Sequence, residues 1–106
     1  LRGEKLDQAE RMSKRSNELA PGSPTYQDTY AWVLFRMGRH ADAKVWMEKA
    51  IAGSPEPDGV LLEHYGDILF EVGDAAAAME QWRKAKAKGG ASPLIDRKIT
   101  EGRRVE

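Results

Sequence analysis

The residues that could carry out acid–base chemistry are few in this sequence and poorly placed for it. It contains two histidines, His40 and His64, and no cysteine. His64 directly follows Glu63, and adjacent residues on a helix do not face each other, so these two do not form an acid–base pair. No metalloprotease, phosphate-binding or serine-nucleophile motif occurs. We therefore predict that the chain is not an enzyme and uses neither a metal nor a cofactor.

The basic residues give little support for phosphate binding. Seventeen Lys and Arg balance seventeen Asp and Glu, and a neutral chain lacks long-range attraction to nucleic acids or membranes. The Lys- and Arg-rich stretch 83–104 is interpreted as a solvated helix face with favourable charges near helix C-termini. No apolar run reaches the ~18 residues of a membrane span. We predict no nucleic-acid partner and no membrane partner. We expect a cytoplasmic location, with an export signal upstream of Leu1 left open.

The elements that must position any functional residue follow from an internal repeat. In residues 30–38 and 65–73, Tyr, a small residue, Leu, Phe and Gly recur in register, 35 residues apart. The match continues through three further pairs, Ala43 with Ala78, Met47 with Trp82 and Ala50 with Ala85. A partial third copy lies upstream and contains Ala9, Ser16 and Pro21. Recurrence at this period is typical of proteins built from stacked helical repeats.

Each copy has the apolar periodicity of helices, and no segment has the alternation of a strand. Ser23, Asp58, Asp74 and Ser92 are expected to cap helix N-termini, and Gly38 to end a helix in a left-handed conformation. The pattern predicts an all-α chain with helices at 6–20, 24–37, 40–53, 59–72, 75–88 and 93–104. Residues 1–106 form one predicted domain, divided into 1–22 (second half of a repeat), 23–56 and 57–91 (full repeats) and 92–106 (capping helix).

The spacing of these residues resembles the tetratricopeptide repeat. The first full copy has Ala31, Leu34, Gly38, Ala43, Met47, Ala50 and Pro55. The second copy has Gly66, Leu69, Gly73, Ala78, Trp82, Ala85 and Gly90, in which glycine replaces the final proline. The tryptophan that usually stands near the start of the unit is replaced by Gln27 and Leu62. The resemblance implies a right-handed superhelical stack of antiparallel helix pairs, from the C-terminal end of a longer bacterial repeat protein.

The resemblance also implies that the first helix of each pair lines a concave groove. The implied groove residues are Asp28, Trp32, Phe35, Arg36, Glu63, Asp67, Phe70 and Glu71. Some members of the family grip a C-terminal carboxylate with Lys, Asn and Arg, but the matching positions here are largely acidic. We therefore expect a partner segment that is basic or apolar. For Phe35 and Phe70, packing between repeats is the alternative interpretation.

The last predicted helix is expected to close the stack. Leu94, Ile95 and Ile99 are spaced to cover the open end, and a terminal repeat needs a polar outer face. That polar face is assigned to Arg97, Lys98, Arg103 and Arg104. The function expected from the whole pattern is a monomeric protein–protein interaction scaffold. The alternative is a structural end segment or self-association surface of a longer repeat protein.

Overall fold

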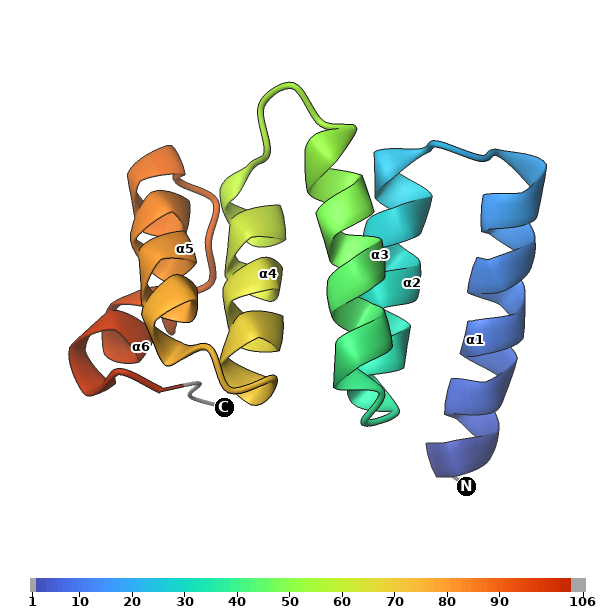
Figure 1. The fold of residues 1–106 in the computed structure, drawn as a ribbon, viewed down its shortest axis with the longest axis horizontal. Coiled ribbons are helices and arrows are strands. Elements are labelled where there is room, and N and C mark those ends of the chain that lie inside the picture. Colours follow the sequence, from blue (N-terminus) through green and yellow to red (C-terminus); the bar gives the residue numbers. More distant parts are fainter. Residues whose placement is uncertain (1, 104–106) are drawn as a thin grey trace. The chain divides into compact units, whose positions relative to one another are not determined.

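The computed structural model describes residues 2–103, with side chains from residue 5 onward, so Arg104 lies outside the described residues. In this range the chain forms six α-helices and no strand, which confirms the all-α prediction (Figure 1). The helices are α1 (Arg2–Leu19), α2 (Pro24–Arg36), α3 (His40–Ala52), α4 (Gly59–Glu71), α5 (Ala75–Lys88) and α6 (Ile95–Glu101).

The two terminal helices differ most from their predicted bounds. α1 begins at Arg2 rather than at the predicted residue 6. The first residues of this helix are mostly polar, so the sequence had no apolar periodicity there from which to predict the helix start. α6 is shorter than 93–104. The predicted cap Ser92 binds Glu63 through its backbone N–H and its hydroxyl, and the helix starts only at Ile95. Gly102, at φ 66°, ends it in the left-handed region.

The chain divides into two compact units, residues 1–55 and 56–106. In the first unit, α2 packs against both α1 and α3. In the second unit, α5 packs against both α4 and α6. The closest helix pairs, α2 with α3 and α4 with α5, are therefore the two pairs formed by the 35-residue repeat.

The turn within each of these pairs has the same construction. Gly38 and Gly73 follow α2 and α4 with φ of 82° and 97°, a conformation that glycine adopts without steric cost. The N–H of Arg39 donates to the carbonyl of Leu34 at 2.9 Å, and that of Asp74 to Leu69 at the same distance. These bonds close the helix end in the Schellman arrangement. The predicted left-handed glycine at position 38 is thus confirmed.

Helix starts also follow the sequence. The side chain of Ser23 accepts a hydrogen bond from the N–H of Tyr26, with Pro24 in the first turn. Asp58 and Asp74 cap α4 and α5 in the same way, through the N–H groups of Leu61 and Ala77. Three of the four predicted caps are therefore confirmed, and each satisfies an N–H that the helix itself leaves unpaired.

The core of each helix pair uses small residues where the helices cross. Ala43 and Ala78 are fully buried at equivalent positions, as are Met47 and Trp82. A Cβ atom on Gly66 would lie 2.5 Å from the Trp82 indole, so only glycine lets that ring rest against α4. The first unit pairs alanine with the smaller Met47 at the same site. The two copies therefore balance a larger side chain on one helix with a smaller residue on the other.

Overpacking at this crossing should open the second unit. Ala78→Phe is expected to lower the free energy of unfolding by about 1–3 kcal/mol or more, because the added ring has no space between α4 and α5. Thermal unfolding followed by circular dichroism measures the change. Ala76→Phe is the matched control, since Ala76 is exposed on the same helix. An unchanged melting temperature for Ala78→Phe would show that the repeat register is wrong.

Candidate functional site

The predicted groove residues form two groups, one on α2 in the first unit and one on α4 in the second unit. On α2, Trp32 and Phe35 are three residues apart and so share a helix face. Their rings stack, with centroids 4.9 Å apart and an angle of 21° between the planes. Phe35 is buried and also contacts the ring of His40 at 5.1 Å, while Trp32 is half-buried. Asp28 is half-buried and Arg36 exposed, one turn before and one turn after Trp32.

The four predicted residues on α4 differ in their surroundings. Glu63 and Asp67 lie one helical turn apart and are 5% and 4% exposed. Phe70 is half-buried and tilts against the ring of Trp82, with centroids 5.9 Å apart. Glu71 is exposed at the helix end. The two acidic side chains in the middle of α4 are therefore covered within the second unit itself.

Lys98 of α6 joins these two carboxylates. Its Nζ lies 2.7 Å from Oε2 of Glu63 and 2.9 Å from both Oδ atoms of Asp67. All three side chains are about nineteen-twentieths buried. Three oxygens at these distances match the three donors of an ammonium group. With both carboxylates ionised, the acidic charge in the cluster exceeds the basic charge by one.

Two further residues complete the cluster. Ser92 donates from its N–H to Oε1 of Glu63 at 2.7 Å and from its hydroxyl to Oε2 at 2.6 Å. The indole Nε1 of Trp82 donates to Oδ1 of Asp67 at 3.1 Å. We call these five residues, Glu63, Asp67, Trp82, Ser92 and Lys98, the lysine cluster. Each buried carboxylate in it has hydrogen-bond donors, as buried charges require.

The pKa values of the two acids shift in opposite directions. For Asp67, burial is the largest influence and raises the pKa above its ordinary value of 3.8, against the lowering effect of Lys98 and Trp82. For Glu63, burial also raises the pKa, but the hydrogen bonds from Lys98 and Ser92 outweigh it. The pKa of Glu63 therefore lies below 4.5. The additional donors on Glu63 explain why it is the more firmly ionised of the two.

Sequence reasoning assigned Lys98 to the polar outer face of the last helix, and this assignment is wrong. Ile95 and Lys98 are the two buried residues of α6. A signal was present, because Lys98 follows Ile95 by three residues and precedes Ile99 by one, which places it on the apolar stripe. The neighbouring Arg97 does point outward, where it pairs with Glu101 on the same helix.

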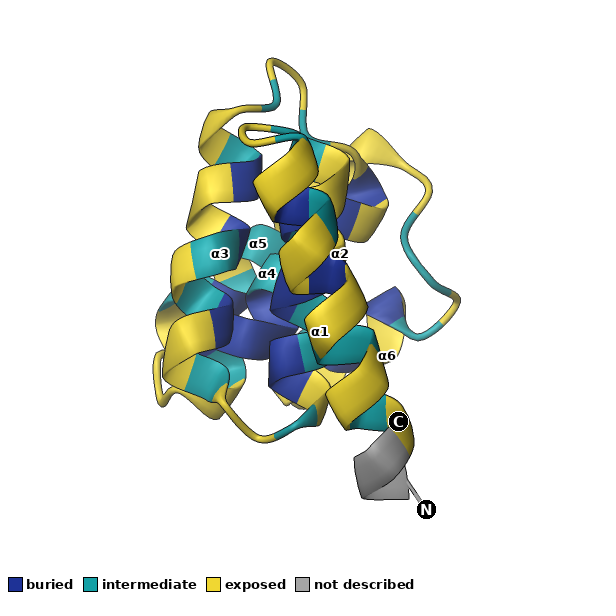
Figure 2. Cartoon of the chain, turned by 90° about the vertical axis from the view of Figure 1, so that its right-hand side faces the viewer, coloured by how far each residue is buried: buried dark blue, intermediate teal, exposed yellow. Residues whose placement is uncertain are grey.

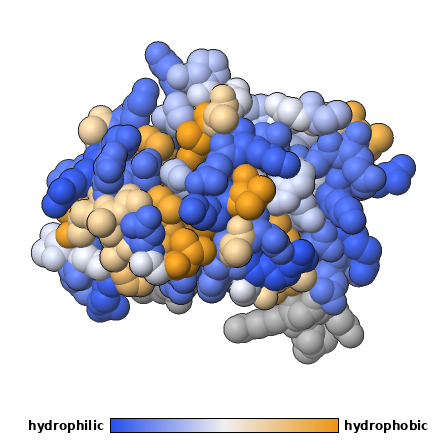
Figure 3. Space-filling model, in the orientation of Figure 1, coloured by the Kyte–Doolittle hydropathy of each residue, from blue (hydrophilic) through white to orange (hydrophobic). Residues whose placement is uncertain are grey.

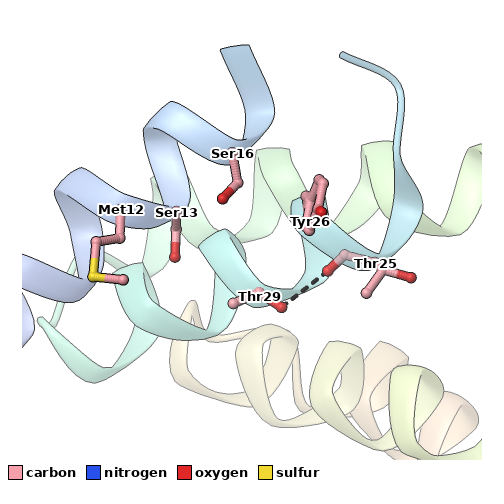
Figure 4. Close-up of a pocket in the computed structure, with 6 residues that line it drawn as sticks. All are labelled: Met12, Ser13, Ser16, Thr25, Tyr26 and Thr29. Carbon is pink, nitrogen blue, oxygen red and sulfur yellow. Dashed lines mark hydrogen bonds between the residues drawn. The ribbon is translucent and has the colours of Figure 1, made fainter. Parts of the chain in front are cut away.

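A second concave feature lies between α1 and α2. An open cavity of about 260 Å³ is lined by Met12, Ser13, Ser16, Thr25, Tyr26 and Thr29 (Figure 4). Around it α1 exposes Met12 and Leu19, at 71% and 74%, while it buries the polar Ser13 and Asn17. Figure 2 shows the mostly exposed outer side of α1, and in Figure 3 the same helix is largely hydrophilic, with isolated apolar side chains.

Other kinds of site are not apparent in the part of the chain that the structure describes. Residues 5–103 contain no group of three or more His, Asp or Glu side chains that could hold a metal ion. None of the helices within residues 2–103 combines the length and the apolar character needed to cross a bilayer.

Trp46, on α3, contacts Tyr30 edge-on at 4.9 Å and carries the Lys49 ammonium 4.1 Å above its ring.

Comparison with protein-family models gives no match, and no curated protein matches the chain in sequence.

Proposed function

We propose that this chain is a tetratricopeptide-like repeat segment that holds a segment of another protein. Its support is the pair of helix hairpins that repeat at 35 residues with the same Schellman turns and the same buried positions. Repeat units of this kind stack because neither hairpin buries both faces of its helices alone, and the arrangement proposed for this chain is a right-handed superhelix. We propose no catalytic activity, cofactor, nucleic-acid partner or membrane partner for it.

The observation that carries the proposal is the aromatic surface on α2. Trp32 is half-buried and its ring is held flat against the buried Phe35. A tryptophan whose position is fixed by a neighbouring ring loses little side-chain entropy on binding, and tryptophan is enriched at interface hot spots. Asp28 and Arg36 flank the ring one turn away on either side. An apolar centre with charged neighbours is the usual organisation of a protein-binding surface.

The partner is a basic or apolar segment. Among the eight proposed groove residues, four are acidic and one, Arg36, is basic. Two of the acids, Glu63 and Asp67, already surround an ammonium group, that of Lys98. Those two are covered within the second unit, and the remaining acids of the proposed groove, Asp28 and Glu71, still outnumber Arg36. Complementary charge speeds association with a basic segment and rejects acidic ones.

Removal of the half-buried Trp32 ring tests the proposal. Trp32→Ala is expected to weaken binding of random peptides rich in Lys and Leu by about tenfold or more, as loss of a hot-spot side chain does. Binding is measured by NMR titration of the isotope-labelled full chain, read at α2 amides. Val45→Ala, an exposed apolar residue in the same unit, is the control and should leave binding unchanged. Tighter binding of Glu- and Leu-rich peptides, or no effect of Trp32→Ala, would contradict the proposal.

A second candidate function is self-association, which the exposed apolar side chains Met12 and Leu19 on α1 favour. On a repeat protein, exposed apolar side chains of a terminal helix pack against the helix of a neighbouring unit. Light scattering on the same samples separates the two functions. A mass that rises with concentration, and that Leu19→Lys returns to the monomer value, would favour self-association over partner binding.

A further inference from the structure

The segment after α5 contacts α4 and α5 as a bound peptide would. Its backbone N–H at Ser92 and its Lys98 ammonium both bind Glu63, and Lys98 also binds Asp67. Ile95 belongs to the buried core of the unit, with Ala91 and Ile99 packed against that core from the edge. The Ser92 hydroxyl also binds Glu63, and Asp96 pairs with Lys86 of α5 at the surface. A few polar groups and a few apolar side chains therefore attach the segment.

Several features make this segment separable from the rest of the unit. α6 has seven residues and no side-chain cap at its start, and a helix of that length is unstable without tertiary contacts. Residues 89–94 before it are not helical, and both Gly89 and Gly90 have positive φ. The segment crosses α4 closely at Gly59, where a Cβ atom would lie 2.8 Å from the N of Ala91. Side chains on α6, the bonds of Ser92 to Glu63 and this crossing hold it in place.

The site beneath the segment is selective for an amine. Two carboxylates one turn apart on α4 surround a single nitrogen, and Trp82 holds one of them from the other side. Without Lys98, two buried carboxylates would face each other with no cation between them, which is unfavourable. A ligand that replaces the segment and covers these carboxylates again must therefore supply a cation, with branched aliphatic residues on either side for the apolar contacts that Ile95 and Ile99 make.

We propose that residues 89–103 act as a reversible internal ligand, and that their site on α4 and α5 accepts in their place a partner segment with the pattern Ile-x-x-Lys-Ile. This inference rests on the proposed role in protein binding, and it names the class of partner and the way in which access is controlled. A tethered segment competes at an effective concentration of the order of millimolar. The closed chain therefore binds such a partner weakly, and release of α6 strengthens binding.

The test uses a fluorescent peptide with the sequence of residues 89–103. It is titrated into the wild-type full chain and into a full chain with Ile95→Ser and Lys98→Ser, which weaken the internal ligand. The variant should bind the peptide at least about tenfold more tightly, because the competing segment is lost. A peptide carrying Lys98→Met should bind neither chain. A full chain with Arg97→Ser, which alters an exposed residue of the same helix, should bind like wild type.

Hydrogen exchange on the wild-type chain keeps the inference testable if the double variant does not fold. The amides of α6 should exchange at least about tenfold faster than those of α4 and α5, through local opening. Equal protection of all three helices, equal affinity of the two peptides, or no gain in the variant would overturn the inference. If Trp32-dependent binding persists in that case, only the internal ligand is disproved. Absence of binding by Lys- and Leu-rich peptides disproves the proposed function instead.

Discussion

Lys98→Met is expected to lower the free energy of unfolding by about 3–5 kcal/mol, the usual loss when one partner of a buried ion pair is removed. Methionine fills a similar volume but provides no cation, so Glu63 and Asp67 would remain buried beside each other. Both are about nineteen-twentieths buried, and solvent cannot take over from the ammonium. A small domain is stable by about 5–15 kcal/mol in total, so this loss is a large fraction of its stability.

Arg97→Met is the matched control for Lys98→Met. Arg97 is the preceding residue on α6, and it makes its ion pair with Glu101 at the surface. Exposed pairs contribute about 0–1 kcal/mol, so this change should have little effect. Urea unfolding followed by NMR at the amides of α4 and α5 reports the second unit directly. Equal losses for the two variants would show that Lys98 does not occupy the buried cluster.

The effect of Lys98→Met should also depend on pH. In the wild-type chain the lowered pKa of Glu63 gives stability above pH 4.5 that is lost on acidification through its folded pKa. The raised pKa of Asp67 has the opposite effect on the fold. The stability that this shift contributes is present below pH 3.8 and is lost as the pH rises through the folded pKa of Asp67. Lys98 lowers the pKa of both Glu63 and Asp67, so its removal raises both pKa values. The variant should therefore lose stability relative to wild type as pH rises above this range.

The helices were largely predictable because their signals are local. Gly38, Asp58 and Asp74 act within one or two turns of their own position, through φ and through hydrogen bonds to nearby N–H groups. The repeat of Ala43 as Ala78 marks the buried side of each second helix in the same way. Such signals need no knowledge of distant residues, and this is why the bounds of α2 to α5 agree with prediction within one residue.

The lysine cluster was not predictable to the same degree, because its contacts join residues far apart in the chain. Lys98 meets Glu63 across 35 residues and Asp67 across 31. Its spacing from Ile95 indicated a buried side, but charged residues are seldom buried, and that general tendency favoured the outer face. Likewise, Ser92 followed by Pro93 has the form of a helix start, and its hydroxyl accepts from the N–H of Leu94 at 3.3 Å, yet the same hydroxyl donates to the distant Glu63 and the helix begins only at Ile95. Local pattern cannot decide between a local and a distant partner.

Trp82→Ala is expected to lower the free energy of unfolding by about 3–5 kcal/mol through loss of the buried ring. Trp82 is fully buried in the core of the second unit. The space it leaves cannot close easily, because Gly66 opposite it has no side chain to fill the cavity. Asp67 would also lose the indole N–H as a donor. The equivalent residue in the first unit, Met47, is also fully buried but smaller, so the cavity left by Trp82→Ala is larger than that left by Met47→Ala.

Trp82→Phe separates the hydrogen bond from the packing. Phenylalanine keeps most of the apolar volume but removes the indole donor from Oδ1 of Asp67, which then keeps its bond from Lys98. A hydrogen bond to a charged group contributes about 1.5–3 kcal/mol. Denaturant unfolding should therefore rank the chains as wild type, Trp82→Phe and Trp82→Ala in decreasing stability. If Trp82→Phe is as stable as wild type, the indole N–H does not stabilise the ionised Asp67, and Lys98 supplies the stabilising hydrogen bonds to that carboxylate.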